Sequence, residues 1–231
     1  MPIEKVNWDS EFFGYNVGKL MLSKGSSFSL QEFLKESESF KLVYIFSQDK
    51  LDDAPLRLMD EKVVFKYNLN QWKKRASNKN LTSFNFSIDG YEQLKQLSLK
   101  SGLYSRFSRD ENFRNDEFQR MYLQWIENLV IKKEAFEIIV YIESNDILGF
   151  ASLNTKEDNT ANIGLVAVSN KARGKGIGSQ LIEEAINIAA AKGFNSIEVV
   201  TQMENQAAVG LYKKCDFEIK SITNIYHYWN L

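Results

Sequence analysis

The sequence predicts an α/β protein in which a small α/β domain, residues 1–70, precedes a larger one, residues 83–231. Three observations support this fold class. An apolar strand pattern at 161–168 leads through a glycine-rich segment into helically spaced apolar residues that end near 192. Strand and helix patterns alternate from residue 83 to the end of the chain. The first 70 residues carry strand and helix patterns of their own.

The small domain is predicted from short stretches of consistent periodicity. Apolar residues at helical spacing indicate a helix within 28–40, and β-branched and aromatic residues indicate strands at 42–46 and 63–67. Aromatic residues gather around a turn at 8–15. Residues 71–82 are polar and lack periodicity, so they are expected to form a linker, and the basic residues 73–75 are expected to be solvated.

The larger domain is predicted as a series of elements ordered β-α-α-β-β-β-α-β-α-β. Helical spacing marks the helices, alternating or β-branched residues mark the strands, and the polar residues 144–146 indicate a hairpin turn. The expected elements are a strand at 84–88, helices at 91–103 and 118–131 around a polar-aromatic loop at 105–113, strands at 136–142, 147–153 and 161–168, the helix to 192, a parallel strand at 197–201, a short helix at 205–215 and a final hairpin at 217–229.

Composition narrows the classes of function. The chain has 231 residues, with 29 Lys and Arg against 30 Asp and Glu, so no basic excess indicates a nucleic-acid partner. A single cysteine, Cys215, and a single histidine, His227, exclude an internal disulfide and a histidine-rich metal site, and we expect no metal. No apolar run suits a signal peptide or a membrane span, so we expect a cytoplasmic protein without a membrane partner.

The glycine-rich segment is the strongest candidate binding site. Gly174, Gly176 and Gly178 open a helix, where unpaired amides and the helix dipole favour an anion such as phosphate. Arg173 and Lys175 add positive charge there. The spacing matches neither a nucleotide P-loop nor a dinucleotide fingerprint. A tight strand-to-helix turn without a ligand is the alternative.

Two motifs resemble those of the GCN5-related N-acetyltransferase (GNAT) superfamily. Arg173, Gly176 and Gly178 fill its Arg/Gln-x-x-Gly-x-Gly pyrophosphate loop. The second signature, Asn-x-x-Ala-x-x-Leu-Tyr-x-x-x-Gly-Phe, is filled by Asn205, Ala208, Leu211, Tyr212 and Phe217. One position departs, because Asp216 stands where the family usually has glycine. That position is expected to need a left-handed backbone, which Asp tolerates at some cost.

The resemblance implies the family's fold, with a mixed central sheet, and acetyl-CoA as cosubstrate. It implies that an amine attacks the thioester directly through a tetrahedral intermediate, with Tyr212 protonating the departing thiolate. An alternative reading of Tyr212 is a core aromatic residue. The expected coenzyme-binding residues, which hold the pyrophosphate, the pantetheine arm and the thioester carbonyl, are Val166, Ala167, Val168, Arg173, Gly174, Lys175, Gly176, Ile177, Gly178, Ser179, Asn205, Ala208 and Tyr212.

Three further segments resemble the dTDP-fucosamine N-acetyltransferase group, which acetylates a nucleotide-linked 4-amino sugar. They are 8–14, the stretch from 105 to 125, and 226–229. Arg106 could meet a substrate diphosphate, and Phe107, Asp110 and His227 complete the expected substrate site. No residue is singled out as the general base, and a water chain could serve instead.

Two other functions remain open from the sequence, and so does the oligomeric state. The same machinery could acetylate a peptide, a polyamine or an antibiotic amine. The fold could also survive as a non-catalytic coenzyme-binding module, although Asn205 and Tyr212 together argue against that. A homodimer is possible.

Overall fold

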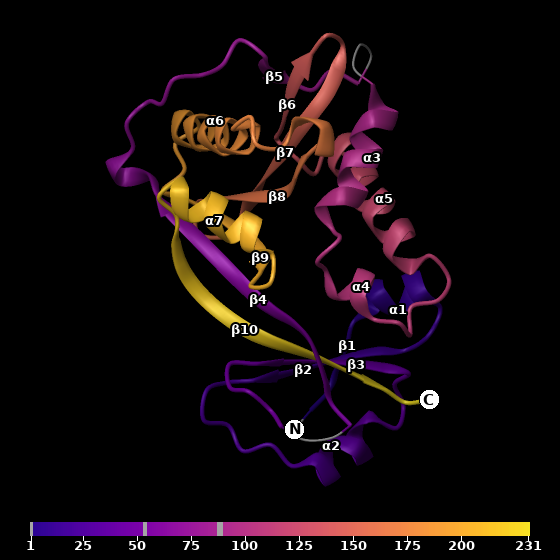
Figure 1. The fold of residues 1–231 in the computed structure, drawn as a ribbon. Helices are drawn as coiled ribbons and strands as arrows, with labels where there is room; N and C mark the ends of the chain where they lie inside the picture. The colour runs from indigo at the N-terminus through magenta and orange to yellow at the C-terminus, as the bar shows by residue number, and fades with distance from the viewer. Residues whose placement is uncertain (1, 53–54, 87–89) are drawn as a thin grey trace. The chain divides into compact units, whose positions relative to one another are not determined.

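The structure is a computed structural model that describes residues 2–52, 55–86 and 90–231 (Figure 1). The chain forms two compact units. The first comprises residues 1–63, 202–204 and 221–231, and the second comprises 64–201 and 205–220. The segment 71–82, expected from the sequence to be a linker, therefore belongs to the second unit.

The first unit is a small sheet with two helices. Its strands lie in the order β1-β2-β3-β10, where β2 and β3 are parallel and the other pairs are antiparallel. The bounds are β1 Glu4–Lys5, α1 Asn7–Phe13, β2 Val17–Leu22, α2 Leu30–Ser37, β3 Leu42–Ser47 and β10 Glu218–Trp229, of which the last begins in the second unit.

The core of the first unit lies between α2 and its sheet. Phe33 of α2, with 1% of its surface exposed, packs with Val43 and Ile45 of β3, which are fully buried. Ser29 caps α2, since its hydroxyl accepts a hydrogen bond from Glu32 N at 3.4 Å. The sequence prediction of a helix within 28–40 is confirmed, with a helix that is shorter at both ends.

The second unit is built on a longer mixed sheet with strand order β4-β9-β8-β7-β6-β5. Strands β5 to β8 pair antiparallel, and β8 and β9 pair in parallel. The strands are β4 Arg57–Asn68, which begins in the first unit, β5 Leu81–Ser83, β6 Glu137–Glu143, β7 Asp146–Lys156, β8 Thr160–Val168 and β9 Ser196–Gln202, whose last residue belongs to the first unit.

Helices cover both faces of strands β6 to β8 (Figure 1). The helices are α3 Tyr91–Ser101, α4 Arg106–Arg109, α5 Glu117–Val130, α6 Ile177–Ala191 and α7 Gln206–Lys214. The helix α3 packs on one face and is backed by α5, while α6 packs on the other face and contacts α7. The face under α3 and α5 forms an apolar core, in which Leu94, Ile126, Val140 and Phe150 are all fully buried.

Most element predictions for the second unit are confirmed, and three are wrong. The segment expected to form a final hairpin is one twelve-residue strand, β10, in which β-branched residues such as Ile222 and Thr223 suit an extended backbone. The strand expected at 84–88 is displaced to β5 at residues 81–83, and residues 87–89 lie outside the described part. The loop at 105–113 contains α4, which Ser105 caps by accepting a hydrogen bond from Ser108 N.

The segment between β4 and β5 runs along α6. Asn187, a nearly buried residue of α6, uses its side chain to bond the backbone N and O of Arg75 at 3.0 and 3.1 Å. Further along, Asn78 Nδ2 donates to Gln180 Oε1 at 2.7 Å. We call residues 72–80 the strap, because polar side chains of α6 hold it at two points.

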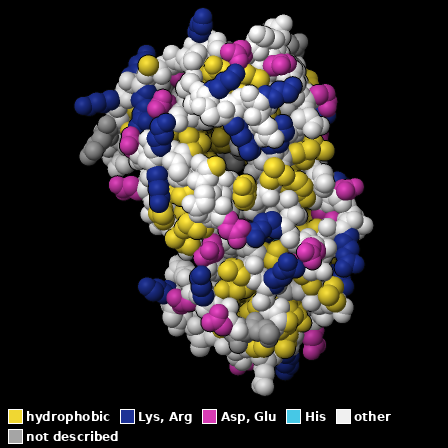
Figure 2. Space-filling view, in the orientation of Figure 1, with side chains coloured by type: hydrophobic (Ala, Val, Ile, Leu, Met, Phe, Trp, Pro, Cys, Tyr) yellow, Lys and Arg dark blue, Asp and Glu magenta, His cyan; other side chains and the backbone are white. Residues whose placement is uncertain are grey.

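The surface is mixed in charge. In Figure 2, acidic and basic side chains are interspersed over the face in view, and neither sign gathers into one large patch. Among the described residues, no helix combines the length and the apolar composition that crossing a bilayer requires.

Candidate active site

The parallel strands β8 and β9 are paired at one end only. Their register joins residues 160–163 to residues 196–199. Beyond Ile163 and Val199 the pairing stops, although β8 continues to Val168. The backbone of β8 from Gly164 to Val168 therefore bonds β7 on one side and presents an edge without a strand partner on the other, within the described chain. Such an edge can accept an extended ligand as an added strand.

A β-bulge accounts for this divergence. The β7–β8 register moves from the pair Leu153–Ile163 to the pair Ala151–Val166, so Gly164 and Leu165 together oppose Ser152. The buried Ser152 hydroxyl accepts a hydrogen bond from Leu165 N at 2.9 Å. A Cβ on Gly164 would approach that same hydroxyl oxygen to 3.0 Å. The bulge bends β8 away from β9.

Sequence reasoning missed this bulge. The pattern at 161–168 predicts a regular strand, although an isolated glycine such as Gly164 inside a strand pattern is the usual sign of a bulge or of close backbone approach. The participation of Ser152, by contrast, had no sequence signal.

The glycine-rich segment forms the predicted turn at the start of α6. Gly174 and Gly176 have φ values of 81° and 75°, in the left-handed region that favours glycine. A Cβ built on Gly174 meets no atom within 4 Å, and one on Gly176 meets only Gln180 Nε2, at 3.8 Å. Space for a ligand thus lies directly against this backbone.

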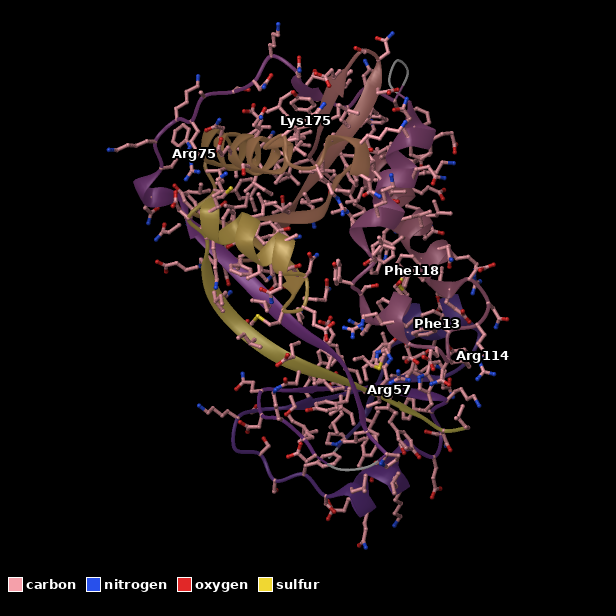
Figure 3. The ribbon with its side chains drawn as sticks, in the orientation of Figure 1. Phe13, Arg57, Arg75, Arg114, Phe118 and Lys175 are labelled. Atoms are coloured by element: carbon pink, nitrogen blue, oxygen red, sulfur yellow. The ribbon has the colours of Figure 1, made fainter. Side chains whose placement is uncertain are left out.

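The amides at this turn are available to an anion. The first hydrogen bond of α6 runs from Gln180 N to Gly176 O at 3.2 Å, so the amides of Ile177, Gly178 and Ser179 have no partner inside the helix. Lys175 lies at this end of α6 in Figure 3, and its ammonium is 3.8 Å from the Glu143 carboxylate. Both side chains are about half exposed, so this ion pair is weak and leaves Lys175 free to move toward an anion.

The second motif forms α7, and its predicted cap is confirmed. Asn205 Oδ1 accepts a hydrogen bond from Ala208 N at 3.2 Å. Gly178 of α6 lies against Leu211 of α7, because a Cβ on Gly178 would come within 3.2 Å of Leu211 Cδ2. The glycine at 178 therefore lets the two motif helices approach each other.

Tyr212 is held in an aromatic cluster. Its ring centroid lies 5.6 Å from that of Phe65 and 6.0 Å from that of Phe217, and the residue is 4% exposed. Burial raises the pKa of the Tyr212 phenol well above its usual value. Its hydroxyl therefore keeps its proton at any physiological pH, as a proton donor must.

Asp216 occupies the backbone conformation expected from its place in the motif. Its φ is 67°, and two hydrogen bonds close the end of α7: Asp216 N to Lys213 O at 3.1 Å and Phe217 N to Tyr212 O at 3.0 Å. This is the Schellman arrangement, in which glycine is the usual residue. The Asp216 carboxylate also bonds Arg75 Nη2 at 2.8 Å.

The one cysteine lies beside this site but is unsuited to covalent catalysis. Cys215 is 1% exposed, and burial raises the pKa of its thiol to about 11. The reactive form of cysteine is the thiolate, which a raised pKa makes scarce. Cys215 is therefore a poor candidate for a nucleophile.

The predicted substrate residues fall into both units. Phe107 of α4 is buried against Phe113 and Trp125, at ring distances of 5.7 and 6.2 Å. The guanidinium of Arg106 lies 4.3 Å from the Phe107 ring, and Asp110 accepts two hydrogen bonds from Asn112. His227 is buried in β10 of the first unit, 5.0 Å from the Tyr44 ring. Among the described residues, no group of His, Cys, Asp and Glu is arranged to hold a metal.

A family model for the acetyltransferase (GNAT) family matches residues 101–217, half of the chain. This range contains the bulge, the glycine turn, α6 and α7. It also contains the carboxyl ends of β8 and β9, which diverge beyond Ile163 and Val199 and which we call the splayed end of the pair. The chain belongs to the GNAT acetyltransferase family. The family's acyl carrier fits the geometry, since the edge of β8, the glycine turn and the cap of α7 lie together in one unit.

Two relatives of this GNAT protein are named for fucosamine acetylation and for polysaccharide biosynthesis. It is 35% identical over 139 residues to the dTDP-fucosamine acetyltransferase of Escherichia coli O6:H1, covering 59% of this chain and 56% of the relative. It is 22% identical over 138 residues to the spore coat polysaccharide biosynthesis protein SpsD of Bacillus subtilis, covering 60% and 47%. The chain thus matches only about half of the length of either relative.

The fold is shared with solved GNAT structures. The GCN5-related N-acetyltransferase of Sphaerobacter thermophilus superposes with a TM-score of 0.55 at 16% identity, covering 86% of this chain and 64% of that one. At this identity, the similarity shows the fold alone.

Proposed function

We propose that this protein transfers the acetyl group of acetyl-CoA to the amine of a nucleotide-linked amino sugar, of the dTDP-4-amino-4,6-dideoxyhexose type. One observation carries the acetyl-transfer part: the splayed edge of β8, the open glycine turn and Tyr212 lie in one unit, within the range that matches the family. Acetyl-CoA supplies the activated acetyl group, and each of these elements has a separate task.

The glycine turn and the start of α6 bind the diphosphate. The amides of 177–179 donate to its oxygens, and Arg173 and Lys175 offset its charge. The edge of β8 from Val166 to Val168 bonds the pantetheine arm and orients the thioester, and a backbone amide there stabilises the developing oxyanion. One such donor contributes about 3–4 kcal/mol in comparable sites.

Tyr212 donates its proton to the leaving sulfur. Its raised pKa keeps the proton in place until negative charge builds on the sulfur. Asn205, fixed as the cap of α7, bonds the pantetheine arm with its side-chain amide.

The sugar acceptor is supported by the relatives and by charge. The name of the Escherichia coli relative specifies dTDP-fucosamine, and the Bacillus subtilis relative is named for polysaccharide biosynthesis. Arg106 and Arg109 both lie on α4, and guanidinium groups suit a diphosphate better than a cationic polyamine. Phe107 and Asp110, in the same unit as α4, are the further residues that we assign to the acceptor, and the role of His227 stays a prediction from the sequence.

A panel of acceptors tests this proposal through thiol release from acetyl-CoA. The panel holds a dTDP-linked 4-amino sugar, the same nucleotide with a 4-hydroxy sugar, the free amino sugar, a polyamine and a peptide amine. We expect fast release only with the first, because it alone combines the amine and the diphosphate. Release only with the peptide or the polyamine would replace the sugar acceptor, and coenzyme binding without release for any amine would indicate a non-catalytic module.

A further inference from the structure

We infer that Arg75 is a positioning residue for Tyr212: from the strap, its guanidinium fixes the left-handed end of α7 through Asp216. The inference rests on the proposed function, in which Tyr212 is the proton donor. Neither Arg75 nor the strap belongs to the matched motifs, since the family match begins at residue 101.

The backbone of Arg75 is held in place by contacts that do not involve its own side chain. The amide side chain of Asn187 bonds both the N and the O of Arg75, and it also accepts from Trp72 Nε1 at 3.2 Å. Asn187 is only 9% exposed and lies on α6. Asn187 therefore fixes the strap against α6 at the backbone of Arg75.

The guanidinium of Arg75 reaches from α6 to the end of α7. Its Nη2 bonds the Asp216 carboxylate at 2.8 Å, and its Nη1 lies 3.7 Å from Glu183 of α6. Its centre lies 5.5 Å from the Tyr67 ring. Figure 3 shows Arg75 beside α6, at the opposite end from Lys175. A planar guanidinium suits this arrangement, because it can bond two carboxylates while facing a ring.

Asp216 is the residue that needs this support. A non-glycine residue in the left-handed region is strained, and Asp216 lies at the turn closed by the hydrogen bond from Phe217 N to Tyr212 O. The Phe217 ring contacts the rings of both Tyr67 and Tyr212. The ion pair with Arg75 thus offsets the cost of the conformation that sets where α7 ends and where Tyr212 lies.

Exposure determines what kind of effect to expect. The Asp216 side chain is 72% exposed, so the ion pair adds little to the global stability of the fold. A local displacement of the end of α7 matters more, because proton transfer depends on placement to within a fraction of an ångström. Loss of Arg75 should therefore lower kcat and leave the melting temperature almost unchanged.

The test compares Arg75→Met with Lys74→Met, the neighbouring basic residue on the strap, which is exposed. We expect Arg75→Met to lower kcat about tenfold while KM for acetyl-CoA stays within twofold, and Lys74→Met to match the wild type. Asp216→Gly provides the second arm, because glycine adopts φ 67° without cost. In the Asp216→Gly background, Arg75→Met should cost less than twofold. An equal cost in both backgrounds would overturn the role of Asp216.

Hydrogen exchange supplies a readout that does not depend on the reaction. Arg75→Met should speed exchange of the amides of Asp216 and Phe217, and Lys74→Met should not. Slow exchange in Arg75→Met would overturn the inference, and so would fast exchange with unchanged kcat. If Tyr212→Phe kept full turnover, the proposed role of Tyr212 would fail, whereas the exchange result would still decide whether Arg75 fixes the end of α7.

Discussion

The parallel pair β8–β9 differs at its two ends. At the amino end, residues 160–163 and 196–199 are paired, and the hydroxyls of Thr160 and Ser196 lie 3.0 Å apart. There the buried carboxylate of Glu198 is bonded at 2.7 Å by Lys156 on one oxygen and by Lys220 on the other. At the carboxyl end, pairing stops, and backbone groups of 164–168 and of the glycine turn are left available.

The difference shows that the polar groups at one end of a strand pair can be satisfied by the protein itself while the other end stays open to a ligand. At the paired end the polar groups of Thr160, Ser196 and Glu198 are satisfied by side chains of the protein itself, which ties β7, β9 and β10 together. At the splayed end the backbone groups are left for a ligand. Changes at the splayed end should therefore alter binding and turnover, and changes at the paired end should alter stability.

The largest effect is expected for Gly176→Val at the splayed end. A β-branched residue disfavours φ 75° and fills the space beside the amides, so acetyl-CoA affinity should fall more than about 100-fold by calorimetry. Gly193→Val is the matched control, since Gly193 has φ 82° at the other end of α6 with no atom near a built Cβ. It should lose stability and keep affinity. Wild-type affinity in Gly176→Val would remove the loop from the site.

Tyr212→Phe should have the next largest effect. Removal of a positioned general acid costs about 10²–10⁴-fold in rate, so we expect kcat to fall at least about 100-fold with little change in coenzyme affinity. Tyr141→Phe is the control, because this buried β6 phenol bonds Asn80 at 3.0 Å. It should lower the melting temperature and leave kcat unchanged. Full turnover in Tyr212→Phe would show that Tyr212 is a core residue only.

Glu198→Gln tests the paired end. Loss of the buried Glu198 charge between two lysines is expected to lower the free energy of unfolding by about 2 kcal/mol. Breaking a fully buried ion pair costs about 3–5 kcal/mol. The cost is smaller here because both lysines are 50% exposed beside a polar cleft of about 380 Å³. Coenzyme affinity should be unchanged. Glu157→Gln, an exposed carboxylate of the same cleft, should have no effect on unfolding.

The pH dependence of this effect follows from the pKa of Glu198. Burial acts to raise that pKa, but the bonds from Lys156 and Lys220 outweigh burial and hold it below the usual value. A lowered folded-state pKa gives stability that is complete above the unfolded value near about 4.3 and is lost as pH falls through the folded value. Urea unfolding should show the difference between wild type and Glu198→Gln at pH 7, and it should shrink below about pH 4. A constant difference would contradict this account.

The smallest effect on the coenzyme site itself is expected for Ser152→Ala at the bulge. The Leu165 amide would lose its buried acceptor at a cost of about 1–3 kcal/mol, and the bend in β8 would loosen, so KM for acetyl-CoA should rise several-fold. Ser196→Ala removes a hydroxyl contact of similar kind from the paired end and should reduce stability alone. Equal changes in KM for both variants would mean that the two ends do not act separately.

Local patterns in the sequence predicted much of the second unit. The helix of residues 177–191, the hairpin turn at Ser144 and Asn145, and the cap made by Asn205 follow from periodicity, turn chemistry and side-chain capping. Each of these depends on residues within about one helical turn of each other. The left-handed backbone at Asp216 was predicted for the same reason.

The sequence alone determined the local parts of the site: a glycine turn able to bind an anion at the start of α6, and a capped helix that carries Tyr212. Only the tertiary structure decided that β8 bends at Gly164 and Leu165, opposite Ser152 of β7, that β10 is a single strand and that Arg75 holds Asp216. The physical reason is distance along the chain. Arg75 and Asp216 are 141 positions apart, so folding alone brings their charges together, and no local pattern encodes that pairing.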